Sequence, residues 1–368
     1  MKFSDVTFIL MSAGNSARFR SPVKKQWLRV GEEPLWEFAA RRVLAEFEFA
    51  KTIVTATPAE ARIVRAISDY EVAEGGETRE ESLRNALTIV ESEWVLVADA
   101  ARALTPIEVI ARVLAEKGAA DSIAPALKVV DTIVTEDGEA ADREKLRRVQ
   151  TPQLSRAAAL REALAAKSGF SDETTLIAAF GGKVKYVEGD ELAGKLTYGG
   201  EIAPEAPSGA ALIGQGFDAH AFEAGKPLRL CGVNVPSDFG LKAHSDGDAA
   251  IHALIDAILG AAGLGDIGTL FPDSDQTYKG IDSAELLART VEMITRFGFK
   301  VLGADITIIA EKPHLEPHKT LMRKNLARLL ALRYERVNVK ATTTEKMGFT
   351  GRGEGIAAQA IAVLGYHN

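Results

Sequence analysis

The histidines of this chain are confined to its second half. The six are His220, His244, His252, His314, His318 and His367, so the first 219 residues contain none. A segment rich in proline, alanine and glycine, residues 201–211, lies just before the first of them and is typical of a linker. The length of 368 residues also suits two domains of ordinary size. We therefore expect two unlike domains, residues 1–208 and 209–368.

Composition limits the class of protein further. Hydrophobic residues make up 46% of the chain and charged residues 26%, which is typical of globular proteins. The net charge of −7 argues against a broad surface for nucleic acid or membrane. The single cysteine excludes an internal disulfide and a zinc site built from several thiolates. The chain begins with a short apolar run that is typical of a strand and not of a secretory signal, so we expect a cytoplasmic protein.

The first half alternates short apolar runs with amphipathic stretches. In one such stretch, Leu83, Ala86, Leu87 and Val90 follow helical spacing, and Thr78 with Glu81 predicts a capping box at the start of that helix. Alternating strands and helices predict an α/β fold with a mainly parallel sheet, whose ligands bind beyond the carboxyl ends of the strands. The predicted strands are residues 6–11, 52–57, 94–98, 122–127 and 183–188.

Two loops after predicted strands carry groups suited to phosphates. The turn Gly14–Ser16 is followed by Arg18, Lys24 and Lys25, so backbone donors and positive charge could converge on a triphosphate. An ordinary turn with solvated cations is the alternative. Asp99 ends a later strand, where a carboxylate could hold Mg²⁺ against phosphates, or could cap a helix.

Together these segments resemble the 2-C-methyl-D-erythritol 4-phosphate cytidylyltransferases, a nucleotidyltransferase family with a Rossmann-like fold. The resemblance covers about residues 1–200 and rests on SAGNSARF, KKQ, EGGETREES, WVLVADAAR, VVDT, the DR that precedes VQTPQ, and GKLT. It implies transfer of CMP from CTP to methylerythritol phosphate, with Mg²⁺ or Mn²⁺ on the nucleotide phosphates. The implied site comprises Arg18 and Lys25 on the CTP phosphates, Gly14, Gly75, Gly76, Glu77 and Ser82 on the nucleotide, Asp99 near the metal, and Thr132, Arg143 and Lys195 on the methylerythritol phosphate.

Five positions depart from the pattern of that family. Ser16 stands where a second glycine is usual, Lys24 and Ala103 where prolines are usual, and Ala98 where a histidine is usual. The asparagine usual ahead of the late lysine is missing near Ala193. None of these departures removes a charged catalytic position. They motivate one alternative, in which the first domain has lost catalysis and serves as a scaffold, and the use of another polyol phosphate is a second alternative.

The second half carries residues with the spacing of a metal site. Asp218 and His220 are two apart in a predicted strand, so both face the same side. On a following helix, Asp248, His252 and Asp256 form one polar row, with His252 off the buried stripe. Asp218, His220 and His252 could hold zinc with an open fourth position, and Asp256 could orient the ring of His252. The alternative is histidines that bind no metal.

The long segments HSDGDAAIHALIDAILGAAGLGDIG and KATTTEKMGFTGRGEGIA closely resemble the 2-C-methyl-D-erythritol 2,4-cyclodiphosphate synthases, over nearly all of residues 210–366. This resemblance implies an α+β domain that cyclises a CDP-methylerythritol phosphate and releases CMP. It implies Zn²⁺ or a similar ion on Asp218, His220 and His252, and a second divalent ion on Glu345. Other implied residues are His244 and Thr343 at the transition state, and Asp266, Ile267, Gly268, Phe271 and Asp275 around the methylerythritol part. Ala310, Pro313, His314, Leu315, Phe349 and Arg352 are implied around the cytidine, and Ser245, Asp256, Thr342 and Thr344 are further substrate-binding residues.

The two resemblances also imply an assembly. Synthases of this family are trimers with active sites between subunits, and the cytidylyltransferases are dimers, so contacts of both kinds in one chain could close into a hexamer. A kinase acts between the two reactions, and a complex with that kinase is a hypothesis motivated by the missing step. The sequence therefore predicts a bifunctional homo-oligomeric enzyme of the non-mevalonate isoprenoid pathway with small-molecule substrates.

Overall fold

The computed structural model describes residues 1–16, 19, 21–166, 169–196, 211–272, 276–278 and 280–367. The chain divides into two compact units, residues 1–204 and 205–368. The predicted linker, and with it the boundary predicted after residue 208, lies outside the described residues. Among the helices that are described, none has the length and apolar composition needed to cross a membrane.

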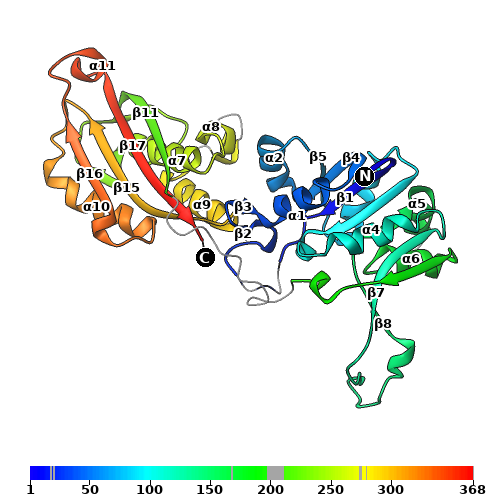
Figure 1. Ribbon diagram of the computed structural model, residues 1–368. Coiled ribbons are helices and arrows are strands. Elements are labelled where there is room, and N and C mark those ends of the chain that lie inside the picture. The colour runs from blue at the N-terminus through cyan, green and yellow to red at the C-terminus, as the bar shows by residue number, and fades with distance from the viewer. Residues whose placement is uncertain are drawn as a thin grey trace. The chain divides into compact units, whose positions relative to one another are not determined.

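The first unit is built on one twisted, mainly parallel sheet of order β10-β7-β9-β6-β1-β4-β5, with β8 paired to β7 (Figure 1). The strands of the first unit are β1 (Lys2–Met11), β2 (Arg29–Val30), β3 (Glu33–Pro34), β4 (Glu48–Ala56), β5 (Glu71–Glu74), β6 (Trp94–Asp99), β7 (Ser122–Lys128), β8 (Arg147–Val149), β9 (Gln153–Arg156) and β10 (Val184–Glu188). Its helices are α1 (Leu35–Leu44), α2 (Pro58–Ile67), α3 (Arg79–Leu87), α4 (Ile107–Ala115), α5 (Ala157–Ala166) and α6 (Glu173–Phe180).

Both faces of this sheet are covered by helices. Along β1, Ile9 packs in a cluster with the apolar sides of α3, α5 and α6, whereas the alternate residues Phe8 and Leu10 lie beside residues of α1 and α4. The five predicted strands are confirmed with shifted ends. Two strands are exceptions to the parallel order: β9 pairs antiparallel with both β6 and β7, and β8 pairs antiparallel with β7. The carboxyl ends of β1 and β6 meet, since Met11 pairs with Asp99.

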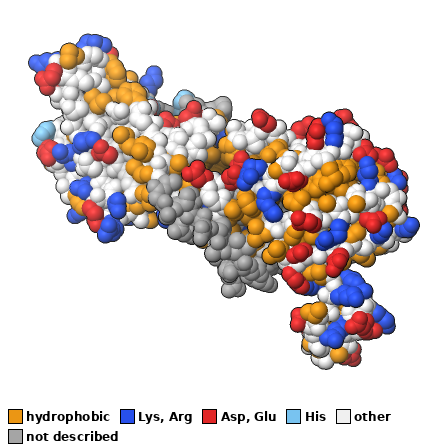
Figure 2. All heavy atoms as spheres, viewed as in Figure 1, with side chains coloured by type: hydrophobic (Ala, Val, Ile, Leu, Met, Phe, Trp, Pro, Cys, Tyr) orange, Lys and Arg blue, Asp and Glu red, His pale blue; other side chains and the backbone are white. Residues whose placement is uncertain are grey.

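A long segment between β7 and β8, residues 129–146, projects from the body of the first unit (Figure 1). We call it the arm. Residues 130–140 are all exposed, including Val130, Ile133 and Val134. Figure 2 shows hydrophobic, basic and acidic side chains together on this projection. A segment of this kind has no core of its own to bury its apolar side chains.

The second unit is an α+β fold with a five-stranded sheet of order β14-β11-β17-β15-β16. Only the β15–β16 pair is parallel within this order. The strands of the second unit are β11 (Leu212–Ala224), β12 (Leu228–Leu230), β13 (Val233–Val235), β14 (Phe239–Leu241), β15 (Phe299–Ile309), β16 (Val337–Thr342) and β17 (Gly355–Tyr366). Its helices are α7 (Ala249–Ala261), α8 (Ile267–Leu270), α9 (Ser283–Arg296), α10 (Lys319–Leu329) and α11 (Gly348–Gly351).

Helix α7 packs directly on one face of this sheet. A Cβ atom added to Gly214 would lie 2.0 Å from the carbonyl oxygen of Ala257, and one added to Gly216 would lie 2.0 Å from that of Ala253. The two glycines therefore allow the backbones of β11 and α7 to touch. Residues 213 and 217, which alternate with these glycines, point to the other face, where Ile213 and Phe217 are exposed.

Candidate active sites

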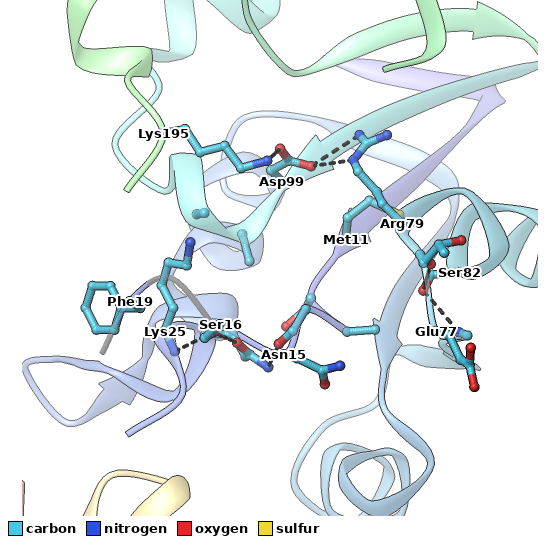
Figure 3. Close-up of a pocket in the computed structure, with 18 residues that line it drawn as sticks. Met11, Asn15, Ser16, Phe19, Lys25, Glu77, Arg79, Ser82, Asp99 and Lys195 are labelled. Carbon is cyan, nitrogen blue, oxygen red and sulfur yellow. Dashed lines mark hydrogen bonds and ion pairs between the residues drawn. The ribbon is translucent and has the colours of Figure 1, made fainter. Parts of the chain in front are cut away.

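The first unit has a cavity of about 290 Å³ at the carboxyl ends of β1 and β6 (Figure 3). Its walls come from the turn after β1, the loop after β5, the start of α3 and the end of β6. This is the position at which open α/β sheets bind ligands. Of the residues expected from the sequence, those that line it are Gly14, Lys25, Gly76, Glu77, Ser82, Asp99 and Lys195.

Asp99 is the buried carboxylate of this cavity. Its Oδ2 accepts a hydrogen bond from Lys195 Nζ at 2.7 Å, and its Oδ1 accepts one from Arg79 Nε at 3.2 Å (Figure 3). Burial would raise the pKa of Asp99, but Arg79 and Lys195 hold it well below its ordinary value. The side chain makes no capping bond to the following turn of helix, so the alternative of a helix cap is wrong. Asp99 is a fixed negative charge between two cations.

Arg79 is a cavity residue that the sequence analysis missed. Its Nη1 donates to Glu173 Oε1 at 2.6 Å, and Glu173 is fully buried at the start of α6. Burial raises the pKa of Glu173. Burial would lower the pKa of Arg79, but Glu173 and Asp99 raise it. This arginine is the first residue of α3, directly after the helix cap Thr78 and the loop that follows β5, and that position is the signal that could have identified it.

Hydrogen bonds connect the turn after β1 to a short 3-10 helix, Lys25–Trp27. Ser16 has a φ of 55°, in the left-handed region that favours glycine. Its hydroxyl uses this geometry, because it accepts a hydrogen bond from Lys25 N at 3.0 Å and donates one to Gln26 Oε1 at 3.2 Å. Gln26 Nε2 in turn donates to Gly14 O at 3.0 Å. This network places Lys25 at the cavity; Arg18 lies outside the described residues.

Lys24 was predicted to lie near a triphosphate but pairs with a buried carboxylate instead. It is absent from the described lining of the cavity and donates to Glu60 Oε1 at 3.0 Å. Glu60 is buried on α2 and also accepts from Trp27 Nε1 at 2.8 Å and Gln26 Nε2 at 3.3 Å. The buried carboxylate therefore fixes the 3-10 helix that carries Lys25, and Lys24 neutralises it.

The loop after β5 approaches the turn after β1 closely. A Cβ atom on Gly75 would lie 2.3 Å from Ala13 Cβ, a separation that real side chains do not adopt. The helix α3 that follows begins at the predicted cap, since Thr78 Oγ1 accepts from Glu81 N at 3.1 Å. The second hydrogen bond of the predicted capping box, from Thr78 N to the side chain of Glu81, is wrong. Glu81 Oε2 instead accepts from Glu77 N at 2.9 Å.

Thr132 and Arg143 lie on the arm and are absent from the described lining of the cavity. Arg143 Nη1 donates to the carbonyl oxygen of Val130 at 2.8 Å, a contact within the arm. The structure thus does not bring these two predicted substrate residues to the cavity of their own chain.

The second unit has a cavity of about 650 Å³ beside α7. It is lined by eight of the predicted residues: Asp218, His220, His244, Ser245, His252, Ile267, Gly268 and Phe271. Asp266 caps α8 next to it, with its Oδ1 accepting from Thr269 N at 2.7 Å. Asp275 lies outside the described residues.

Asp218, His220 and His252 converge in this cavity. Each offers one ligand atom, and the three atoms lie within 4.8 Å of one another. His220 Nε2 is 2.9 Å and His252 Nδ1 is 3.1 Å from Asp218 Oδ2. Burial would raise the pKa of Asp218, but the two imidazoles hold it well below its ordinary value. For His252 burial would lower the pKa, but Asp218 raises it. One carboxylate and two ring nitrogens are a donor set that suits a divalent transition metal.

The polar row predicted on α7 is wrong. His252 is buried and not off the buried stripe, since helix α7 is covered on nearly all sides. Asp248 is fully buried and caps the helix, accepting from Ile251 N at 3.1 Å and from Cys231 N at 2.9 Å. Asp256 accepts from Ile267 N at 2.8 Å and so holds the start of α8, not the ring of His252.

The remaining predicted residues form a second group on two loops of this unit. One loop follows β15 and the other follows β16, and Glu311 Oε1 joins them by accepting from Thr344 N at 3.3 Å and Lys346 N at 3.1 Å. Glu345 is exposed and accepts from Thr343 Oγ1 at 3.2 Å. This group does not line the cavity at Asp218 in the described part of the chain; its members are Ala310, Pro313, His314, Leu315, Thr342, Thr343, Thr344, Glu345, Phe349 and Arg352.

Comparison with known proteins assigns both units. The family described as 2-C-methyl-D-erythritol 4-phosphate cytidylyltransferase matches residues 6–205, and the YgbB family matches residues 211–365. The bifunctional enzyme IspD/IspF of Wolinella succinogenes is 49% identical over 98% of this chain and 96% of its own length. The corresponding enzyme of Aliarcobacter butzleri is 47% identical over 99% of this chain and 98% of its own length.

A solved structure agrees with these relatives. The structure of bifunctional IspDF from Campylobacter jejuni matches with a TM-score of 0.87 and 44% identity, over 99% of both chains. The resemblances drawn from the two halves of the sequence are therefore confirmed over the whole chain. This chain belongs to the bifunctional IspD/IspF family of isoprenoid biosynthesis, whose members combine a methylerythritol phosphate cytidylyltransferase domain and a cyclodiphosphate synthase domain.

Proposed function

We propose that the first cavity transfers CMP from CTP to 2-C-methyl-D-erythritol 4-phosphate through the residues described above. An oxygen of the methylerythritol phosphate attacks the α-phosphorus of CTP, the bond from that phosphorus to the bridging oxygen breaks, and pyrophosphate leaves. The attacking phosphate is already ionised, so the site needs charge neutralisation and in-line placement more than a general base. The observation that carries the proposal is the cluster of Asp99, Lys195 and Arg79 opposite Lys25.

The ion pairs of Asp99 suggest how this site changes when it binds substrates. Both carboxylate oxygens are engaged by cations. We infer that Lys195 exchanges Asp99 for the methylerythritol phosphate, which leaves Oδ2 available. Mg²⁺ or Mn²⁺ would arrive with the triphosphate and supply further neutralisation of its charge. Lys25 and Arg18 are assigned to the CTP phosphates, and Gly14, Gly75, Gly76, Glu77 and Ser82 to the nucleotide.

Phosphorus NMR tests the first activity. The protein is incubated with CTP, Mg²⁺ and methylerythritol 4-phosphate, and the diphosphate diester and pyrophosphate are followed. We expect product with the unaltered chain and at least about 100-fold less with Lys25→Ala, since a cation on the transferring phosphates is lost. Lys2→Ala is the control, because Lys2 is an exposed surface lysine paired with Glu48. A folded unaltered protein that gives no product would favour the scaffold alternative for this domain.

For the second cavity we propose cyclisation of 4-CDP-2-C-methyl-D-erythritol 2-phosphate. The 2-phosphate attacks the β-phosphorus of the CDP group, the bond to the bridging oxygen breaks, and CMP leaves. Asp218, His220 and His252 would hold Zn²⁺ or a similar ion, which acts as a Lewis acid on a phosphate oxygen when bound. His244, which lines the cavity, and Thr343 are assigned to the transition state, and Glu345 to a second divalent ion.

Metal analysis tests this assignment. We expect about one zinc per chain after equilibration and dialysis, and no zinc in an Asp218→Asn variant. Glu223→Gln is a matched control, because Glu223 lies on the same strand, pairs with Lys226 and is absent from the described lining of the cavity. Equal zinc content in Asp218→Asn would contradict the proposed ligand set.

We also propose that the chain forms a homo-oligomer that completes both sites. The exposed Val130, Ile133 and Val134 of the arm and the open face of the second sheet support this, since Ile213, Phe217 and Ile361 are exposed together on that face. Trimers through the sheet and dimers through the arm would close into a hexamer. Sedimentation equilibrium tests it, and a monomer at micromolar concentration would contradict it. A complex with the kinase that acts between the two reactions is a further proposal, and absence of co-sedimentation at micromolar concentration would contradict it.

A further inference from the structure

The imidazole of His252 is held on the side opposite the proposed metal position. Its Nδ1 lies 3.1 Å from Asp218 Oδ2 and 3.2 Å from His220 Nε2, so this nitrogen faces the ligand cluster. Its Nε2 lies 2.9 Å from Ser283 Oγ. Ser283 is the first residue of α9 and is fully buried. A buried hydroxyl that contacts the outer nitrogen of a ligand ring is placed to orient that ring.

The direction of this hydrogen bond follows from the other partner of the serine. Ser283 Oγ donates a hydrogen bond to Asp246 Oδ1, and Ser283 N donates to Asp246 Oδ2 at 3.2 Å. Arg229 Nη1 lies 3.5 Å from the same carboxylate. A hydroxyl has one proton, and a carboxylate beside an arginine can only accept. Ser283 therefore donates to Asp246 and has only lone pairs left for His252.

The tautomer of His252 is fixed as a result. Because Ser283 can only accept there, His252 Nε2 carries the proton and donates it. In a neutral ring the lone pair then lies on Nδ1, the nitrogen that faces Asp218 and His220. We propose that Ser283, held by Asp246, is the positioning residue that keeps His252 oriented for metal binding. This inference rests on the proposed function, since it requires the metal site at Asp218, His220 and His252.

A second hydroxyl near the same nitrogen serves as the comparison. Ser245 Oγ lies 3.1 Å from His252 Nε2 and accepts from Gly247 N at 3.2 Å. Among the hydrogen bonds of the described residues, Ser245 has none to a carboxylate, so its hydroxyl does not by itself decide which ring nitrogen of His252 carries the proton. Its removal takes away a similar contact without breaking the link from His252 through Ser283 to Asp246.

Zinc affinity measured against a chromophoric chelator tests the inference on the full-length chain. We expect Ser283→Ala to bind zinc about 10- to 100-fold more weakly than the unaltered protein, the range for loss of such a partner. Asp246→Asn should weaken zinc in the same direction, and Ser245→Ala should bind within about threefold of the unaltered chain. The visible absorption of bound Co²⁺ should change in Ser283→Ala, because the ring is no longer fixed, and remain in Ser245→Ala.

Thermal unfolding of the metal-free proteins separates orientation from folding. An unchanged midpoint for metal-free Ser283→Ala together with weaker zinc supports a positioning role. If Ser283→Ala does not fold, Asp246→Asn and Ser245→Ala still decide the question. Unaltered zinc affinity and Co²⁺ absorption in folded Ser283→Ala or Asp246→Asn would overturn the inference alone. Failure of the unaltered chain to bind zinc would overturn the proposed metal site, and this inference with it.

Discussion

Gly75 brings two loops of the first cavity into contact, and its lack of a side chain is what permits this. In Gly75→Ala the added Cβ would meet Ala13 Cβ at 2.3 Å, so the loops after β1 and β5 must separate. We expect the KM for CTP in steady-state assays to rise about tenfold or more, with a smaller effect on folding. The double variant Gly75→Ala with Ala13→Gly removes the clashing carbon and should recover most of the loss. No recovery would show that the approach to Ala13 is not the cause.

Asp99 makes the stability of the first unit depend on pH. Its pKa is lower in the folded chain than in the unfolded chain, so its contribution is complete above a pH of about 4. The contribution is lost as the pH falls toward the lowered value. We expect Asp99→Asn to reduce the free energy of unfolding at pH 7 by roughly 1 to 3 kcal/mol.

Urea titrations followed by tryptophan fluorescence measure this effect in the right unit, because Trp27, Trp36 and Trp94 all lie in the first half of the chain. The difference between Asp99→Asn and the unaltered protein should be constant above a pH of about 4 and shrink as the pH falls from there toward about 3. A difference that grows over this range would mean that the carboxylate is not stabilised by its cations.

At the residue scale, the sequence predicted groups whose chemistry is local. Asp218 and His220 share one side of a strand, so their spacing placed both correctly, and Asp99 stands where the end of its strand predicted it. Arg79 and Ser283 could not be predicted in the same way. Their partners, Glu173 and His252, come from distant parts of the chain, and only folding reveals the contacts.

At the scale of elements, Glu60 joins α2 to the 3-10 helix that carries Lys25. Its two oxygens accept from Trp27, Gln26, Lys24 and Thr57. A glutamine at this position would point the hydrogens of its amide at groups that are themselves hydrogen-bond donors. We therefore expect Glu60→Gln to lower the free energy of unfolding by roughly 2 kcal/mol and to raise the KM for CTP.

Tryptophan fluorescence also measures the Glu60→Gln effect, because Trp27 is one of the donors. The matched control is Glu74→Gln, since Glu74 is exposed and pairs with Arg65 at 3.4 Å. The control should lower stability by less than about 0.5 kcal/mol. Equal effects in the two variants would show that the buried network does not hold the helix.

The sequence predicted the elements whose hydrophobic patterns are long enough to be recognised. Five strands of the first sheet follow from apolar runs, but β9 has four residues and inserts antiparallel between β6 and β7. No local pattern specifies such an insertion, because its pairing is decided by distant strands. The polar row predicted on α7 was wrong for a related reason. The helix is buried on nearly all sides, so Asp248 is its cap and His252 a proposed metal ligand, and they do not form a solvent-facing row.

At the scale of the whole molecule, each cavity lacks groups that the family resemblance assigns to it. Thr132 and Arg143 lie on the arm, and Thr343 and Glu345 lie on loops that do not line the cavity at Asp218. The sequence could predict that these residues belong to the sites. It could not predict that, within one chain, these residues lie away from the two cavities. That depends on the course of the arm and of the loops in the folded structure.

Mixing two inactive variants tests whether the arm acts on a second copy. Lys25→Ala removes a cation from the cavity, and Arg143→Ala removes one from the arm. If the arm completes the cavity of a partner, a mixed dimer has one site with both residues intact. Random exchange of equal amounts should therefore restore about a quarter of the unaltered cytidylyltransferase activity. If the arm serves its own chain, every site in the mixture keeps one lesion, and phosphorus NMR should show no recovery. Synthase activity, which depends on neither residue, should stay constant throughout and confirms that the mixed chains are folded.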